Sequence, residues 1–508
     1  MRDLRTARLG LLCLTTLLLS RLELSADAAG AWGQWRGPEG TGVAPHSNPP
    51  VEWSEETNIR WKVAIPGKGH ASPIVWGDRI FLLTAIKTDE AVEAPTTQPA
   101  AEVEEAPAAH PTTEVHEAPT TQPPVETGKE PTARQHEVAE APTSPPTSET
   151  PKEEPRWRRR GGGRGRGMRG VTTKSVHEFA VLALDRQDGS VLWQQTLRRE
   201  LPHEGTHNDG SWASSSPVTD GEHLYVSFGS RGIYCLDMEG NLQWEKDLGR
   251  MKIRMSFGEG SSPALLDDRL IVNFDHEGES FIVALSKKTG EELWRMPRDE
   301  RTSWATPLVV EHDGRSQIIT NGTTRIRSYD GKTGELIWEA GGMTPNAIPS
   351  PVTADGVVYL MSGFRGNALL AIPLARARGD ITDSDAIAWT LDRDTPYTPS
   401  PLLYGDNLYF LKGNNGVLTC LDPATGDHHF GPQRLESIEG VYASPVGASG
   451  RVYIAGRNGV TLVIKQGPEF EVLAENHLDE SFSASAAIAG DEIFLRGQTS
   501  LYCIATDE

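Results

Sequence analysis

The sequence has little cysteine, no excess of basic charge, and no long apolar run beyond its first twenty residues. Only 4 of 508 residues are Cys and none are spaced as C-x-x-C, which excludes a disulfide-dense scaffold and gives no zinc motif. A net charge of −21 disfavours nonspecific binding of nucleic acid. No later stretch is apolar enough to span a bilayer as a helix. What the chain has in quantity is 51 Gly, 35 Pro and 13 Trp, which is typical of turn-rich β structure.

The N-terminus has the pattern of an export signal. Arg2, Arg5 and Arg8 precede the short apolar run of residues 9–20, and Ala26-Asp27-Ala28 forms an A-x-A cleavage site. The run is too short to span a membrane, and no small residue precedes Cys13 as a lipoprotein site would require. We therefore predict a signal peptide over residues 1–28, a leader over 29–57, and a periplasmic or secreted mature protein.

One segment cannot belong to a packed core. Residues 89–155 contain 15 Asp or Glu, 3 Lys or Arg and 13 Pro, and residues 156–170 then contain 7 Arg. Low hydrophobicity and high charge predict disorder over the whole insert, residues 88–175. Three interpretations of the insert stay open: a self-neutralising linker, an adhesion segment for acidic polymers of the cell envelope, and a polyanion-binding tract.

Internal repeats predict the fold. A unit that begins with Ser-Pro and holds about four short β-rich runs recurs down the chain, most clearly over residues 215–244. The units begin at Ser72-Pro73, Ser216-Pro217, Ser262-Pro263, Thr306-Pro307, Ser350-Pro351, Ser400-Pro401, Ser444-Pro445 and Ser485-Ala486. Four strands in a unit of about 40–50 residues are typical of a β-propeller blade. We predict an all-β, eight-bladed propeller with four-stranded blades over residues 58–508, with the insert inside blade one.

Tryptophan marks the end of each unit and shows how the ring closes. Trp ends the fourth strand of blades one to five, at Trp193, Trp244, Trp294, Trp338 and Trp389. Blade eight runs out after Leu501-Tyr502-Cys503 without a fourth strand. Residues 58–65, upstream of blade one, have the missing pattern with Trp61 in the Trp position. We predict that this N-terminal strand closes the ring and protects the edge of blade eight.

Three copies of one sequence motif resemble the repeat of a known family. ALDRQDGSVLW (183–193), ALSKKTGEELW (284–294) and YDGKTGELIW (329–338) resemble the pyrroloquinoline-quinone (PQQ)-like propeller repeat. That superfamily contains the quinoprotein alcohol dehydrogenases and BamB, an accessory protein of outer-membrane assembly. WGQWRGPEGTG at 32–42 also resembles the leader that precedes many bacterial propellers of this kind. The resemblance is specific for fold and weak for function.

For an enzyme, the resemblance implies PQQ with calcium, an Asp general base and usually two adjacent cysteines bonded beneath the cofactor. The chain has no adjacent Cys pair. Candidate calcium ligands by residue type are Glu259, Asn273, Asp275 and Asn346. A PQQ- and calcium-dependent oxidoreductase therefore stays as the alternative to a non-catalytic propeller.

The three cysteines that follow the predicted export signal occupy equivalent positions in their repeat units. Cys235, Cys420 and Cys503 occupy the third-strand position that Ala183, Ala284 and Ala371 hold in other blades. A position filled by Ala or Cys is a small buried packing site. We predict no disulfide and unreactive, buried thiols.

Two acidic and histidine-containing runs suggest metal sites only weakly. Asp275-His276-Glu277 is expected to be a turn with solvated charges, and Asp427-His428-His429 a solvated loop. No G-x-S-x-G elbow accompanies the many serines that precede the unit prolines.

The predicted ligand site is the mouth of the central channel. Residues three to six before each unit's Pro, or before Ala486, project there if first strands line the channel: His70, Trp212, Phe257, Glu259, Trp304, Asn346, Tyr397, Tyr442 and Phe482. Aromatic and polar groups that converge on a funnel suit a small ligand or an extended peptide. The alternative is that they stack between blades as core.

We predict a monomeric binding or scaffold protein with a protein or peptide partner in the cell envelope.

Overall fold

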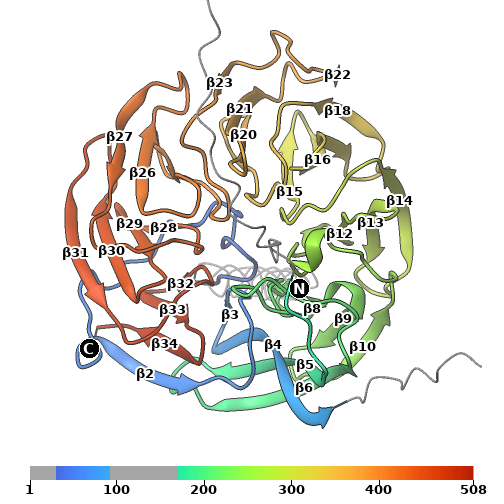
Figure 1. Ribbon diagram of the computed structural model, residues 1–508, viewed down its shortest axis with the longest axis vertical. Helices are drawn as coiled ribbons and strands as arrows, with labels where there is room; N and C mark the ends of the chain where they lie inside the picture. The colour runs from blue at the N-terminus through green and yellow to red at the C-terminus, as the bar shows by residue number, and fades with distance from the viewer. Residues whose placement is uncertain (1–29, 92–169, 507–508) are drawn as a thin grey trace, which may run out of the picture. The chain divides into compact units, whose positions relative to one another are not determined.

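The computed structural model describes residues 30–91 and 170–506, which belong to one compact unit and form a ring of eight antiparallel sheets (Figure 1). Each sheet has a core of four strands, so the predicted eight-bladed, all-β propeller is confirmed. The only helical turns among the described residues are two short 3-10 segments, Gly229–Arg231 and Arg254–Ser256.

The strands follow the repeat units closely. Blade one contains β3 (Ile74–Trp76), β4 (Arg79–Ala91), β5 (Ser175–Asp185) and β6 (Val191–Glu200), and blade two contains β7 (Val218–Thr219), β8 (His223–Ser227), β9 (Ile233–Asp237) and β10 (Leu242–Lys246). Blade three contains β11 (Ala264–Leu266), β12 (Arg269–Phe274), β13 (Ser280–Ser286) and β14 (Glu292–Arg298), and blade four contains β15 (Leu308–His312), β16 (Arg315–Thr320), β17 (Ile326–Asp330) and β18 (Leu336–Ala340). Blade five contains β19 (Val352–Ala354), β20 (Val357–Ser362), β21 (Ala368–Pro373) and β23 (Trp389–Leu391), and blade six contains β24 (Leu402–Leu403), β25 (Leu408–Leu411), β26 (Val417–Leu421) and β27 (His428–Arg434). Blade seven contains β28 (Val446–Ala448), β29 (Arg451–Ala455), β30 (Val460–Lys465) and β31 (Val472–His477), and blade eight contains β32 (Ala487–Ala489), β33 (Glu492–Arg496), β34 (Ser500–Ile504) and β2 (Ile59–Ala64). Two short strands add to blades in parallel: β22 (Gly379–Asp380) to β18, and β1 (Val43–Ala44) to β28.

Strand position in a blade determines the burial pattern. The middle strands β8, β25 and β33 are buried over nearly all their residues, because neighbouring blades pack on both of their faces. The outer strand β6 is partly or fully exposed throughout. Figure 1 shows β3, β28 and β32 near the centre of the ring and β6, β14 and β31 at its periphery.

The ring closes where the sequence predicts. Strand β2 pairs antiparallel with β34, and Trp61 lies opposite Cys503. The N-terminal strand thus supplies the fourth strand of blade eight, so the two ends of the propeller meet in one sheet.

Each repeat Trp packs against the next blade. The indole Nε1 of Trp61, Trp193, Trp244 and Trp389 donates to a backbone carbonyl in the next blade, at distances between 2.8 and 3.1 Å. Beneath the Trp244 ring lies Gly290, which has a φ of 71° and where a Cβ would lie 2.7 Å from the indole. Positive φ and a similar close approach to the preceding repeat Trp recur at Gly189, Gly240 and Gly334, which explains the Gly found four residues before the Trp in these units. Trp338 differs, since its Nε1 donates to Gln317 in its own blade.

The cysteine positions behave as predicted. Cys235, Cys420 and Cys503 are buried free thiols, and burial raises the pKa of each thiol to about 12. Cys503 lies between Trp61 and Phe494 on the neighbouring strands. A small side chain is needed because large rings stand on both sides of it.

Strands β4 and β5 form one long hairpin. They pair from Arg79 with Asp185 out to Ala91 with Ser175, so the strands extend into the predicted insert at residues 88–91 and at 175. The predicted disorder and Arg cluster of residues 92–169, and the predicted signal peptide with Cys13, lie outside the described residues.

Replacing residues 92–169 with a short Gly-containing turn is expected to leave the propeller folded with an unchanged or slightly higher melting temperature. The flanking strands already pair in register, and loop-closure entropy changes by only about 0.6 kcal/mol per doubling of loop length. Thermal denaturation of the two proteins checks this. Limited proteolysis of the full chain should cut first within this segment; failure of the shortened chain to fold would contradict the prediction.

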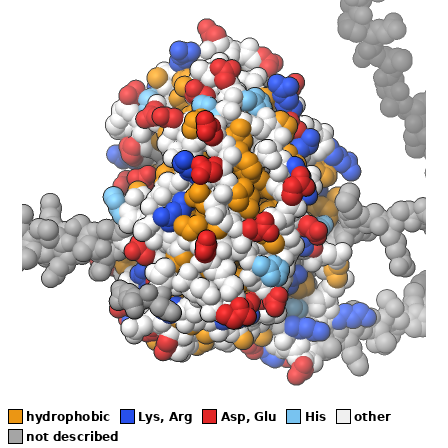
Figure 2. Space-filling model, turned by 90° about the vertical axis from the view of Figure 1, so that its left-hand side faces the viewer, with side chains coloured by type: hydrophobic (Ala, Val, Ile, Leu, Met, Phe, Trp, Pro, Cys, Tyr) orange, Lys and Arg blue, Asp and Glu red, His pale blue; other side chains and the backbone are white. Residues whose placement is uncertain are grey.

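Some apolar side chains on the outer strands remain exposed. They include Val191, Leu192, Leu242, Leu293, Leu336, Val472 and Leu473. Figure 2 shows hydrophobic side chains gathered among charged ones on the side of the ring that carries β27 and β31. In the described part of the chain, no helix is long and apolar enough to cross a membrane.

Candidate functional site

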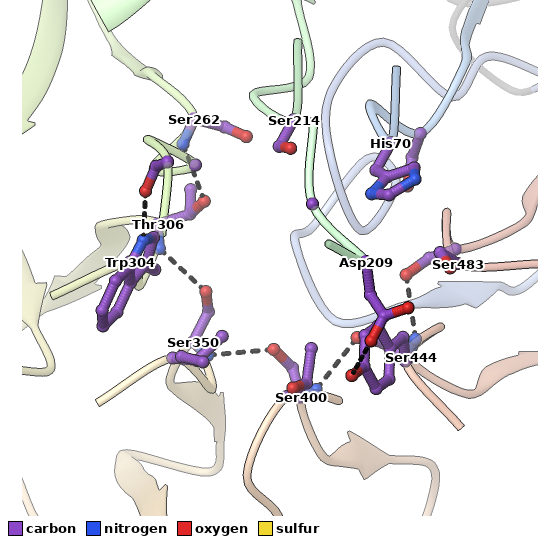
Figure 3. A pocket seen from close by; sticks show the side chains of 18 of the residues that line it. His70, Asp209, Ser214, Ser262, Trp304, Thr306, Ser350, Ser400, Ser444 and Ser483 are labelled. Atoms are coloured by element: carbon purple, nitrogen blue, oxygen red, sulfur yellow. Dashed lines mark hydrogen bonds between the residues drawn. The ribbon is translucent and has the colours of Figure 1, made fainter. Parts of the chain in front are cut away.

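A cavity of about 260 Å³ lies where the segments that lead into the first strands converge (Figure 3). Aromatic rings form part of its wall: Trp35, His70, His207, Phe257, Trp304, Tyr397 and Tyr442. Most of the remaining wall carries hydroxyl groups. The side chains that line it include two carboxylates, Asp209 and Glu259, and neither Lys nor Arg.

The Ser or Thr that precedes each unit's Pro, together with Ser485 before Ala486, forms a hydrogen-bonded series around the channel, which we call the hydroxyl ring. At seven junctions between blades, the backbone N–H of one such residue donates to the side-chain hydroxyl of its equivalent in the next blade, at 2.9 to 3.1 Å. The bonds link Ser72, Ser216, Ser262, Thr306, Ser350, Ser400, Ser444 and Ser485 in that order. Figure 3 shows the part of this series from Ser262 to Ser444. The proline that follows each of these residues except Ser485 favours an extended conformation. The repeated Ser-Pro is therefore the device that joins the inner edges of neighbouring blades.

Replacing Ser400 with Ala is expected to lower the free energy of unfolding by about 1–3 kcal/mol, because the buried N–H of Ser350 loses its acceptor. Ser400→Thr is the matched control, since Thr306 serves the same role in blade four. Urea denaturation measures both variants. Equal stability of the Ala and Thr variants would show that the hydroxyl has no structural role.

The leader before β2 packs against the inner edge of the ring. Trp32 pairs with Val75, and β1 adds to the inner strand of blade seven. Arg36 is 3% exposed and donates to the carbonyls of Thr41, Pro401 and Pro445. The WRGP part of the leader thus places Trp35 in the cavity wall and Arg36 directly behind two residues of the hydroxyl ring.

A loop from blade one to blade two reaches past blade eight and contacts blade seven. Asp209, in the segment between β6 and β7, accepts from Arg457 of blade seven at 2.7 Å and from the Tyr442 hydroxyl at 3.3 Å. Burial raises and Arg457 lowers the pKa of Asp209, with a net shift downward. His207 packs edge-on against Phe257 in the same wall. Asp209 therefore fastens the loop beside the cavity.

Six of the nine residues predicted for the channel mouth line this cavity: His70, Phe257, Glu259, Trp304, Tyr397 and Tyr442. Trp212 lies outside it, with its ring tilted by 56° against that of His177. Asn346 is buried beneath the surface and donates weakly to the Tyr397 hydroxyl at 3.4 Å. Phe482 is fully buried against Tyr502, as the alternative core interpretation expected.

The sequence interpretation missed Trp35, His207, Asp209 and the hydroxyl ring. Two signals pointed to Trp35 and to the hydroxyl ring: the WGQWRGPEGTG leader and the Ser that precedes nearly every unit proline. Asp209 had no such signal, since its partners lie 233 and 248 residues further along the chain.

Asp275 corrects a prediction. Its run was expected to be a solvated turn, but the side chains of Asp275 and Arg298 are 0% exposed and their closest contact is 2.7 Å. Ser303 and Asn273 also donate to Asp275, at 2.6 and 3.0 Å. In contrast, Asp427 and His428 are exposed, as predicted, but the predicted loop is wrong because His428 and the half-buried His429 begin strand β27. Among the residues that the structure describes, no three His, Cys, Asp or Glu side chains cluster as metal ligands would.

The sequence matches the family model described as outer membrane protein assembly factor BamB, over residues 177–428 and 278–507. The chain belongs to this PQQ-like β-propeller family. A search of curated proteins found no match.

Solved structures with a similar fold include both functional branches of the superfamily. A europium-containing methanol dehydrogenase matches at 10% identity and a TM-score of 0.55, over 93% of this chain and 90% of that one. A quinohemoprotein alcohol dehydrogenase from Pseudomonas putida HK5 matches at 10% identity and a TM-score of 0.51, over 96% and 82%. BamB from Moraxella catarrhalis matches at 12% identity and a TM-score of 0.45, over 66% and 89%. At these identities the likeness shows the fold alone.

The residues present do not fit the calcium-bound quinone of the family's enzymes. Glu259 already accepts from the Ser230 backbone and hydroxyl and from Arg231. Asp275 is saturated by Arg298, Ser303 and Asn273. A calcium ion needs several open oxygen ligands. Glu259 already accepts three hydrogen bonds and Asp275 four, and among the described residues only the amide Oδ1 atoms of Asn273 and Asn346 in this set have no partner.

Proposed function

We propose that this chain is an exported, non-catalytic binding propeller of the cell envelope that takes a small ligand or an extended peptide at the mouth of its channel. The observation that carries the proposal is the cavity itself. Aromatic rings from the leader and from the segments before blades one, two, three, four, six and seven converge on it together with a wall of hydroxyls, which suits recognition of a partly apolar, hydrogen-bonding ligand.

The titratable groups in the wall support binding rather than catalysis. Asp209 is held by Arg457 and Tyr442, and Glu259 by Arg231 and Ser230. Burial, followed by the nearby charges of Lys68 and Arg496, lowers the pKa of His70 to about 3. An imidazole with that pKa is neutral at physiological pH and far from the range in which a general base works best.

The test begins with peptides. A library of random linear peptides is selected on the immobilised full chain, and an enriched peptide is then titrated by calorimetry. Trp304→Ala and Tyr397→Ala are expected to weaken binding at least tenfold, because each removes an aromatic surface from the cavity. Leu293→Ala, on the exposed outer strand of blade three, is the control and should bind normally. Selected peptides that bind both cavity variants as well as the control would refute the proposed site.

A second measurement separates the enzymatic alternative. The protein is mixed with PQQ and calcium, and both its melting temperature and dye-linked alcohol oxidation are followed. The proposal expects no oxidation; turnover that depends on both additions would replace it with a quinoprotein oxidoreductase.

A further inference from the structure

The charges around the cavity do not balance once its ion pairs are counted. Asp209 is paired with Arg457, and Glu259 with Arg231. Two further guanidinium groups lie behind the wall, those of Arg36 and Arg496. Burial alone lowers the pKa of each of these two arginines to about 9, and neither forms an ion pair among the described residues.

Both of these arginines lie close behind residues that line the cavity. Arg36 donates to the carbonyls of Pro401 and Pro445, which directly follow Ser400 and Ser444 in the ring. The Nε of Arg36 has no hydrogen-bond partner in the described part of the chain. Arg496 donates to the Leu83 carbonyl and lies against Gly69, next to His70. Positive charge that is buried without a counter-ion is costly, and it attracts an anion to an adjacent polar cavity.

The hydroxyl ring supplies donors at the same place. Each ring hydroxyl that accepts a backbone N–H donates no hydrogen bond within residues 30–91 and 170–506, so its proton is available to the cavity. Ser350, Ser400, Ser444 and Ser485 are all more than nine-tenths buried and line the cavity. The buried Oγ of Ser483, also in the wall, has no hydrogen-bond partner among the residues that the structure describes. Figure 3 shows Ser350, Ser400, Ser444 and Ser483 around the same space.

We propose that the cavity holds an oxyanion, a carboxylate or phosphate group of its ligand, through the hydroxyl protons of the ring in the positive field of Arg36 and Arg496. This inference rests on the proposed binding function and specifies the chemical class of the ligand. Hydroxyl donors that face a site backed by buried positive charge favour an acceptor that carries negative charge.

The experiment titrates the full chain with sodium phosphate, sodium acetate and glucose, against sodium chloride at matched ionic strength. Saturable binding of phosphate or acetate, seen by calorimetry and as a rise in melting temperature beyond that in chloride, is expected. Whichever of the two anions binds with the higher affinity shows whether the ligand group is a phosphate or a carboxylate. Phosphate and acetate effects no larger than that of chloride would overturn the inference.

Two variants locate the anion. Arg36→Gln keeps donors for the carbonyls but removes the charge, and is expected to weaken anion binding at least tenfold. Ser483→Ala removes a hydroxyl that has no partner, so the fold should be unaffected while affinity falls severalfold. Arg295→Gln, in an exposed pair on the outer strand of blade three, is the control. Anion binding that is unchanged in Ser483→Ala and in a folded Arg36→Gln protein would place the anion elsewhere and overturn the inference.

The two proposals fail separately. If a selected peptide binds at the aromatic wall but no anion binds or competes with it, the inference is wrong and the proposed function stands. If anions saturate the site and no peptide does, the ligand is a small anion rather than a peptide. If neither binds, both proposals are wrong.

Discussion

A chain that lacks residues 1–65 is expected to aggregate rather than remain a monomeric propeller. The deletion removes β2, so β34 becomes an open edge with unpaired backbone groups. It also removes Trp61, which is 8% exposed and packs against Phe494. Light scattering and thermal denaturation measure the outcome.

A point variant separates the effect of the closing strand from the effect of losing the leader, since the deletion removes both. Trp61→Ala keeps β1 and Arg36 but empties the indole site, and should lower the free energy of unfolding by about 3–5 kcal/mol. Leu293→Ala, an exposed residue on another outer strand, is the control and should change it by less than about 0.5 kcal/mol. A monomeric deletion variant with an unchanged melting temperature would show that β2 does not close the ring.

Asp275→Ala is expected to lower the free energy of unfolding by about 3–5 kcal/mol, because it leaves the Arg298 guanidinium buried without its partner. Arg298 also donates to Thr320 and to the Tyr329 hydroxyl, so its position is fixed and it cannot turn toward water. Chemical denaturation checks the size of the effect.

Two controls show whether the loss of stability in Asp275→Ala comes from the unpaired buried charge or only from the lost contact. Removing both charges, in the double variant Asp275→Leu with Arg298→Met, should recover much of the loss, since two apolar side chains need no counter-ion. Arg295→Gln, which breaks the exposed pair with Glu292, should cost less than about 1 kcal/mol. A single Asp275→Ala variant as stable as Arg295→Gln would refute the buried-pair interpretation.

Much of the fold could be predicted because a propeller repeats one local pattern. The spacing of the Ser-Pro pairs predicted the number of blades, and the Trp positions predicted the outer strands. The missing fourth strand of blade eight pointed to the N-terminal segment that contains Trp61. The position shared by Cys503 and Ala284 indicated a small slot, since both stand between larger residues on adjacent strands.

The candidate site was only partly predictable. Counting back from each Pro found Trp304 and Tyr442 in the cavity wall, because the segments before first strands converge there. The same count misplaced Phe482, since whether a side chain turns toward the channel or the core depends on local backbone direction. Asp275 was misjudged because its neutralising partner, Arg298, lies 23 residues away on another strand.

The sequence by itself determined the blades, their order and the way the ring closes, because ladder pairing and Trp packing recur at fixed spacing along the chain. Only the tertiary structure decided what faces the channel. The Ser-Pro units join into a hydroxyl ring, Arg36 lies behind that ring, and Asp209 reaches Arg457 of blade seven. These contacts join residues up to 409 positions apart. Their partners meet because the ring brings the inner ends of all its blades together, and no periodicity within a single unit encodes that meeting.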